Sequence, residues 1–152
     1  MGFTSGFGTG FAALILALAA SPVAAATGAP VDVDISGVRN ARGAILVCLT
    51  ADPKAYPDCG RDPKSRKLSI PARPSDTARF DNVPPGTYAI ALIHDENSNN
   101  RLDKNKMGVP TEGFAFSNNA MGAFGPPKYL RARFQVKADS LNVQTIRLRK
   151  FQ

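Results

Sequence analysis

Residues 80–93 read FDNVPPGTYAIALI, and this stretch decides the fold class of the chain. A Pro-Pro-Gly turn is followed by a run rich in β-forming residues, which predicts a strand. Its bulky residues Tyr88, Ile90 and Leu92 alternate with smaller ones, so we expect them to share one face of a sheet. His94 continues that face at the end of the predicted strand.

Six other segments carry the apolar pattern of short strands. They are residues 31–36, 44–50, 67–70, 76–80, 129–136 and 141–149. The continuous apolar run at 44–50 indicates a central strand, which we expect to be joined to 31–36 by a hairpin. Pro71 and Pro74 separate the third and fourth segments, and because proline cannot donate to a central ladder, both segments are expected at sheet edges.

The two last segments predict inward apolar faces. Alternation in residues 129–136 predicts an inward face made of Leu130, Ala132, Phe134 and Val136. In residues 141–149 the apolar positions change phase, so a bulge near Gln144 or Thr145 is expected to keep them all inside. The whole pattern predicts an all-β fold: an antiparallel β-sandwich of about seven strands, immunoglobulin-like or prealbumin-like, with one long ordered loop.

The first 26 residues differ in composition from the rest. Residues 11–20 form an uncharged apolar run, followed by Pro22 and small residues up to Ala26. This is the form of a secretory signal peptide, and a bilayer-spanning helix would need about 20 apolar residues. We therefore expect a signal peptide at 1–26 and a single periplasmic or secreted domain at 27–152, without a transmembrane helix. A permanent membrane anchor is the weaker alternative.

The chain has two cysteines, Cys48 and Cys59, eleven positions apart. An oxidising compartment outside the cytoplasm favours a disulfide bond between them. The alternative is that Cys48 is simply a small buried apolar residue between Val47 and Leu49.

The formal net charge of +7 is carried entirely by residues after position 26. A basic exported domain favours partners with negative charge: acidic polysaccharide, lipid headgroups or an envelope protein. Nucleic acid is not expected as a partner. Four arginines, Arg131, Arg133, Arg147 and Arg149, could form a basic face on the last two predicted strands, or simply a solvated surface.

The strand that ends at residue 93 is followed by a long connection, residues 94–127, which begins HDENSNNRLDKNKMGVPTEG. Connections of this length in a compact domain are usually functional. Asp95, Asn97, Asn99 and Asp103 stand at relative positions 1, 3, 5 and 9, the offsets at which a tight loop presents oxygens to a hard cation.

This spacing predicts a calcium site that Asp103 closes and to which Glu112 folds back. The predicted ligand set, which includes position 7, is Asp95, Asn97, Asn99, Arg101, Asp103 and Glu112. Asn100 at position 6 tolerates the left-handed turn that such loops need. Lys106 stands where an EF-hand has its bidentate Glu, so a standard EF-hand is excluded. The expected Kd for calcium is on the order of 10⁻⁴ to 10⁻³ M. The alternative is a metal-free series of Asx turns.

His94 is the single histidine of the chain and could serve a small hydrolase or metal-dependent enzyme together with Asp95, Glu112 or Ser117. No Gly-x-Ser-x-Gly nucleophile motif is present, so a structural hydrogen bond at the strand end is the favoured interpretation.

Aromatic residues follow in the second half of the connection. Phe114, Phe116 and Phe124 stand among glycines and a proline, and with His94 they are the candidate ligand-binding residues. They either pack back on the sandwich or form an exposed aromatic platform for a sugar or a peptide.

Four motifs of this chain are typical of one bacterial family. They read FDNVPPGTYAI at 80–90, HDENSN at 94–99, LD at 102–103 and GVPTEGFAFSNN at 108–119. On these motifs, residues 31–148 resemble the exported bacterial proteins grouped as domain of unknown function 2141, which usually have Gly where Asn100 stands. The resemblance implies an extracytoplasmic domain without an assigned activity. The sequence thus favours an exported, calcium-stabilised binding or interaction module of the cell envelope, with a small hydrolase centred on His94 as the alternative.

Overall fold

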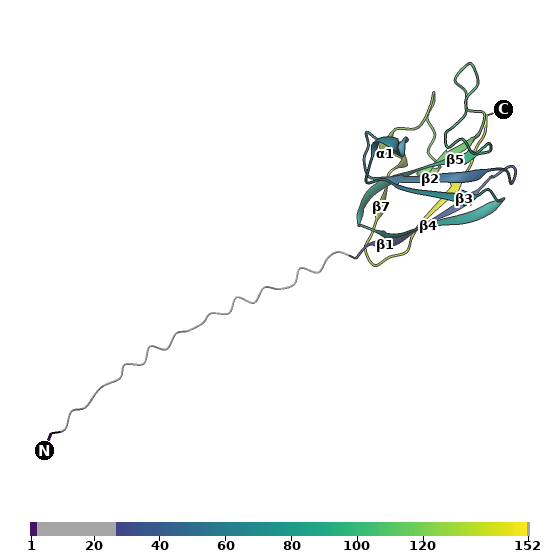
Figure 1. The fold of residues 1–152 in the computed structure, drawn as a ribbon. Coiled ribbons are helices and arrows are strands. Elements are labelled where there is room, and N and C mark those ends of the chain that lie inside the picture. The colour runs from purple at the N-terminus through teal and green to yellow at the C-terminus, as the bar shows by residue number, and fades with distance from the viewer. Residues whose placement is uncertain (3–26, 152) are drawn as a thin grey trace.

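The computed structural model describes residues 1–2 and 27–151, so the predicted signal peptide lies almost wholly outside the described residues. In the described part, eight strands form two sheets (Figure 1). The strands are β1 (Ala29–Ser36), β2 (Ala44–Thr50), β3 (Arg66–Pro71), β4 (Ser75–Val83), β5 (Gly86–Asp95), β6 (Gly113–Phe116), β7 (Phe134–Val136) and β8 (Asn142–Arg147). The helical turns are η1 (Cys59–Arg61), η2 (Ser117–Asn119) and α1 (Tyr129–Ala132). Across the described residues, no helix is long and apolar enough to cross a membrane.

The two sheets pack face to face, which confirms the predicted all-β sandwich. One sheet has the order β4-β1-β8, and the other has the order β3-β2-β5-β6, with β7 also paired to β5. All neighbours are antiparallel except β1 and β8, which run parallel. The predictions of a central β2 and of β3 and β4 at sheet edges are both confirmed, in agreement with the prolines that flank β3 and β4.

Alternating apolar residues of both sheets build the core. Val31, Val33 and Ile35 of β1 are buried in one sheet, and they share a cluster with Ile90 and Leu92 of β5 in the other. Tyr88 is partly buried against the same cluster, so the predicted shared face of β5 is confirmed. Burial of this apolar surface is the main driving force that holds the two sheets together.

The segment between β1 and β2 is not a hairpin, and that prediction is wrong. β1 pairs with β4 and β8, whereas β2 pairs with β3 and β5, so residues 37–43 cross from one sheet to the other. Gly43 ends the crossing with a φ of 67°, and a Cβ at this position would lie 1.9 Å from the carbonyl oxygen of Asp95. Only glycine therefore allows the crossing to pass so close to the end of β5.

Residues 129–136 form α1 followed by the short strand β7, and not one continuous strand as predicted. Leu130 is exposed, whereas Ala132 and Val136 are buried as expected. The amide of Arg133 bonds to the carbonyl of Tyr129, and the Tyr129 hydroxyl donates to the Thr87 carbonyl at 3.0 Å. Because these hydrogen bonds anchor Tyr129, residues 129–132 form a helical turn, although their apolar and polar residues alternate as in a strand.

β8 contains no bulge, contrary to the prediction. Its register with β1 is unbroken from Asn142 to Arg147. Ile146 and Leu148 are buried, but Leu141 and Val143 are 61% and 45% exposed. Without a bulge, only one phase of the strand can face the core.

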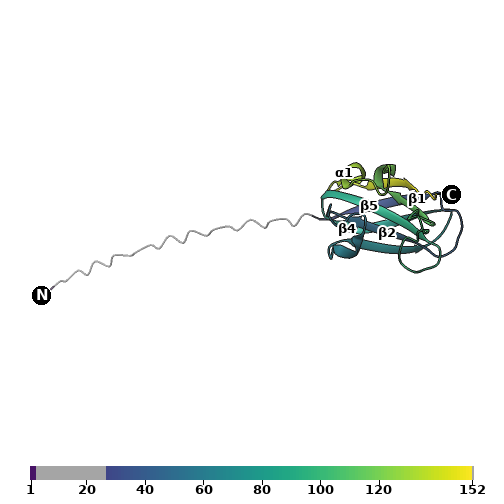
Figure 2. The ribbon, with the colours of Figure 1, turned by 90° about the horizontal axis from the view of Figure 1, so that it is seen from above.

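The disulfide prediction is confirmed, since Cys48 and Cys59 are bonded with their Cα atoms 6.1 Å apart. The bond fastens η1 to the outer face of β2, opposite the core. Figure 2 shows that α1 and β8, the C-terminal strand drawn in yellow, lie along the same edge of the molecule.

Ser117 closes a gap in the ladder of β5. β5 pairs with β7 at residues 86–88 and with β6 at residues 91–94, which leaves Ile90 between the two partners. The Ser117 hydroxyl accepts a hydrogen bond from the Ile90 amide at 2.9 Å and donates to the Ala132 carbonyl, and Ser117 is fully buried. This side chain therefore replaces a missing strand partner.

We expect Ser117→Ala to lower the free energy of unfolding by about 1–3 kcal/mol, because it leaves a buried amide and a buried carbonyl without partners. Urea unfolding followed by circular dichroism measures this. Ser140→Ala, in an exposed turn, is the control and should be neutral. Equal stability of the two variants would contradict the bridging role of Ser117.

Candidate functional site

The loop between β5 and β6, residues 96–112, projects from the sandwich in Figure 1. Asp95 ends β5 immediately before it and is 1% exposed. One oxygen of its carboxylate accepts the amide hydrogen of Asn99 at 3.1 Å, and the other accepts that of Asn100 at 2.7 Å. The side chain thus folds the start of the loop around itself.

Glu112 holds the same loop from its other end. It precedes β6, is 4% exposed, and accepts the amide hydrogens of Glu96 at 2.9 Å and Asp103 at 3.0 Å. Its two oxygens therefore join the start and the middle of the loop to the strand that follows it.

Asp103 receives the amide groups of the two asparagines. Asn97 Nδ2 donates to one carboxylate oxygen at 2.6 Å, and Asn99 Nδ2 donates to the other at 2.9 Å. Arg101 Nε lies 3.8 Å from the second oxygen. Pairwise contacts therefore link all six residues of the predicted ligand set within one loop.

Two left-handed residues make this loop tight. Ser98 has a φ of 62° and Asn100 a φ of 64°. The conformation of Asn100 is the one expected at position 6, and it turns the Asn100 amide toward Asp95. Asparagine adopts this region at less cost than most residues, because its short polar side chain bonds locally.

The chemistry of the loop fits a hard cation. Asp95 and Glu112 are buried carboxylates, and within the described residues neither forms an ion pair with Lys or Arg. Each carboxylate oxygen accepts one of these bonds and has a further lone-pair direction. The groups of this loop that could serve as ligands of a hard cation are the carboxylates of Asp95, Asp103 and Glu112 and the amide oxygens of Asn97 and Asn99.

The same loop also has features of the metal-free alternative. In the part of the chain that the structure describes, no three His, Cys, Asp or Glu side chains gather as a preformed metal cluster. The amide nitrogens of Asn97 and Asn99, and not their oxygens, face Asp103. Binding of a cation would therefore require both amides to turn.

His94 forms a structural hydrogen bond at the end of β5. Its ring is 2% exposed, and Nε2 lies 2.9 Å from the carbonyl oxygen of Arg42. Among the described residues, no hydrogen bond joins His94 to Asp95, Glu112 or Ser117, and Ser117 is itself fully buried. The structure thus does not assemble these residues into a nucleophile and its base.

The predicted aromatic residues separate into two groups. Phe114 and Phe116 pack back on the outer face of the β3-β2-β5-β6 sheet, with ring centroids 5.8 Å apart and each 6% exposed. Phe124 is fully exposed. Phe114, Phe116 and Phe124 therefore do not form one exposed platform, and His94 lies on the opposite, core-facing side of β5.

A groove of about 810 Å³ runs over this outer face. Its lining comes from β2, β3, β5 and β6, from the segment around the disulfide bond, from residues 100–110 and from residues 125–126. The groove was not predicted from the sequence, because its lining is drawn from segments far apart in the chain.

A second hollow, of about 490 Å³, is basic. Its lining includes the charged residues Arg39, Arg147, Arg149 and Lys150. The other two arginines of the predicted basic face, Arg131 and Arg133, lie on α1 and just after it and do not line the hollow. Arg39 was not predicted, since it comes from the crossing between β1 and β2.

The comparisons with known proteins give one match. Residues 33–144 match the family described as uncharacterized proteins conserved in bacteria, DUF2141. The chain belongs to the DUF2141 family. No curated protein and no solved structure matches this DUF2141 chain.

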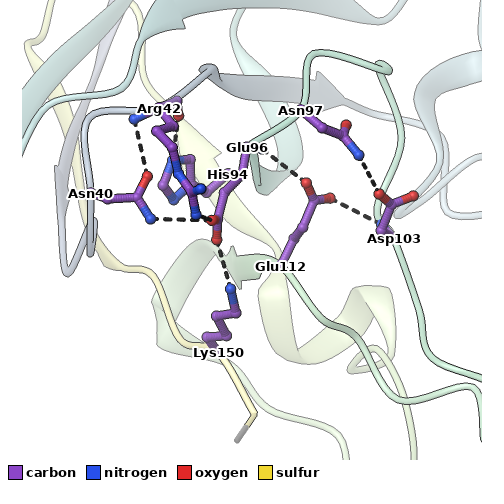
Figure 3. A network of polar contacts seen from close by, with 8 residues as sticks. All are labelled: Asn40, Arg42, His94, Glu96, Asn97, Asp103, Glu112 and Lys150. Atoms are coloured by element: carbon purple, nitrogen blue, oxygen red, sulfur yellow. Dashed lines mark hydrogen bonds and ion pairs between the residues drawn. The ribbon is translucent and has the colours of Figure 1, made fainter.

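Glu96 connects the loop of this DUF2141 protein to its C-terminal end (Figure 3). Its carboxylate accepts hydrogen bonds from Lys150 Nζ at 2.7 Å, from Arg42 Nη2 at 2.8 Å and from Asn40 Nδ2 at 3.1 Å. The hydrogen bond from Lys150 is the main cause that lowers the pKa of Glu96 to about 2. No role of Glu96 was predicted from the sequence.

The lowered pKa makes the stability from Glu96 depend on pH. The ionised form is favoured in the folded state, so the contribution is complete above the unfolded pKa of about 4.5 and is lost as the pH falls toward about 2. We expect Glu96→Gln to lower the free energy of unfolding by about 1 kcal/mol at pH 7 and to have little effect near pH 2. Urea unfolding across this range measures the difference, which should also shrink in a Lys150→Ala background. A difference independent of pH would contradict the assignment.

Proposed function

We propose that this DUF2141 protein is an exported binding module of the cell envelope, stabilised by calcium in the loop at 95–112. The observation that carries the calcium part is the pair of buried carboxylates, Asp95 and Glu112, which accept hydrogen bonds from backbone amides but, within the described residues, form no salt bridge with a cationic side chain. Burying charge without a partner is costly, and a bound cation would remove that cost.

Export is supported by two independent features. The first is the composition of residues 1–26, which has the form of a secretory signal. The second is the Cys48–Cys59 disulfide bond, since such bonds persist in oxidising compartments such as the periplasm and the cell exterior.

A binding role without catalysis is supported by the placement of His94. The His94 nitrogen Nε2 is engaged with a backbone carbonyl, and the Ser117 hydroxyl is engaged with the backbone of β5 and α1. An enzyme would need a polar group free to meet a substrate in a cleft, whereas a binding module needs only shaped surfaces.

Negatively charged partners are supported by the charge of the domain and by the basic hollow. Arg39 and Arg147 are exposed there, and within the described residues neither forms a salt bridge. Uncompensated cationic side chains that converge on a hollow attract acidic polysaccharide, lipid headgroups or acidic protein surfaces.

Calcium at about 10 mM is expected to raise the free energy of unfolding by about 1.4–2.7 kcal/mol, for a Kd on the order of 10⁻⁴ to 10⁻³ M. Thermal unfolding with and without calcium measures the shift as a rise in the midpoint. Glu112→Gln and Asp103→Asn should abolish the rise, and Asp81→Asn, an exposed carboxylate of β4, should keep it. A midpoint that calcium does not change in the unmodified protein would contradict the proposal.

Binding to an acidic polysaccharide such as alginate should be salt-dependent and should involve the basic hollow. We expect Arg39→Glu with Arg147→Glu to weaken it about tenfold or more at low salt, because two attractive charges become repulsive. Arg61→Glu with Arg73→Glu, an equal charge change at exposed positions outside the hollow, is the control. Equal weakening by the two pairs would show that net charge alone, and not the hollow, governs binding.

A further inference from the structure

The groove over the β3-β2-β5-β6 sheet has the size and the floor of a small-molecule site. Its volume of about 810 Å³ lies in the range that holds drug-sized ligands, which is about 300–1,000 Å³. The floor is apolar: Leu46 of β2 and Ile93 of β5 are paired neighbours, and Ala91 lies beside Phe116 in the ladder. Phe114 completes this floor.

Two walls of the groove are fixed in place. At one end, the Cys48–Cys59 disulfide bond holds Pro57 and Cys59 against the outer face of β2. At the other end, Leu102 and Pro110 belong to the loop that Asp95 and Glu112 fasten. A groove with fixed walls is largely preformed, which lowers the entropic cost of binding.

The rim of the groove is basic. Lys67, Arg101 and Lys104 line it, against one acidic residue, Asp58, whose carboxylate already accepts the amide hydrogen of Gly60 at 2.9 Å. Arg101 Nε lies 3.8 Å from Asp103 Oδ1. Among the described residues, neither Lys67 nor Lys104 forms a salt bridge with an acidic side chain. The rim therefore offers two uncompensated positive charges above an apolar floor.

We propose that this groove binds an alkyl-chain carboxylate, with the chain on the floor and the carboxylate at the basic rim, to which Lys67 contributes at the disulfide end and Lys104 at the loop end. Burial of the chain stabilises the complex, and each buried methylene group increases the affinity roughly fourfold. The two ammonium groups select a negative headgroup over a neutral or positive one. The proposal goes beyond the proposed binding function by adding a second site, separate from the basic hollow, with its own ligand class, and it does not require that calcium binds.

Decanoate is the probe, and isothermal titration calorimetry is the measurement. We expect decanoate to bind saturably, with one molecule per protein. Decyltrimethylammonium, which has the same chain and a positive head, should bind more weakly, by about tenfold or more. Acetate, which has the head without the chain, should not bind measurably. Equal affinity for decanoate and decyltrimethylammonium, or no saturable binding of decanoate, would overturn the proposal.

Charge reversal on the rim tests the headgroup position. Lys67→Glu with Lys104→Glu should weaken decanoate binding about tenfold or more, because two attractive charges become repulsive. Both lysines are exposed and their side chains make no hydrogen bond in the described structure, so the fold should be kept. Lys54→Glu with Lys137→Glu, which changes the net charge equally at exposed positions outside the groove, should bind as the unmodified protein does. Equal weakening by both pairs would overturn the headgroup assignment.

Methyl NMR locates the chain. Decanoate should shift the methyl signals of Leu46, Ile93 and Leu102, which line the groove. Shifts confined to Leu141 and Val143, the exposed pair at β8, would mean adsorption elsewhere and would overturn the proposal. A stable dimer in sedimentation, in which NMR shows the groove methyls to be shielded, would also overturn the proposal. The occupant of the groove would then be a second copy of the chain.

The titration is performed in calcium-free buffer and again with calcium, whereas calcium binding is read from the unfolding midpoint without decanoate. If decanoate fails to bind in both buffers while calcium raises the midpoint, the groove proposal fails alone. If decanoate binds in either buffer while calcium leaves the midpoint unchanged, the calcium proposal fails alone.

Discussion

Four hydrogen bonds from backbone amides to Asp95 and Glu112 hold the loop between β5 and β6. The two carboxylates lie at opposite ends of one loop and are both almost fully buried. Between them they satisfy the amides of Glu96, Asn99, Asn100 and Asp103. Because charge-assisted bonds of this kind are roughly twice as strong as neutral ones, the loop is ordered without any regular secondary structure.

Much of the surface depends on this loop. Residues 100–110 form one wall of the apolar groove, so the shape of the groove follows from the positions of the two carboxylates. Glu96, whose amide bonds to Glu112, carries the contact to Lys150 and so fixes the C-terminal end of the chain. The crossing between the sheets also meets this region, where Gly43 contacts the backbone of Asp95.

The sequence predicted what neighbouring residues determine. Alternation identified the buried face of β5, proline placed β3 and β4 at edges, and the spacing from Asp95 to Asp103 identified the residues that meet in the loop. It did not predict α1, because a tyrosine hydroxyl that reaches Thr87 is a long-range contact. It also missed the exposure of Leu141 and the crossing after β1, since period-two alternation does not say which strand will be the neighbour. Asn119 went unnoticed for the same reason, although its amide group pairs with Thr145 and Arg147 along β8.

The central claim is that the buried carboxylates hold the loop through its amides, and native-state hydrogen exchange measured by NMR tests it most directly. The amides of Glu96, Asn99, Asn100 and Asp103 should exchange far more slowly than those of Ser98 and Lys106, which have no acceptor within the described residues. Exchange of all six amides at the rate of an unprotected peptide would contradict the account.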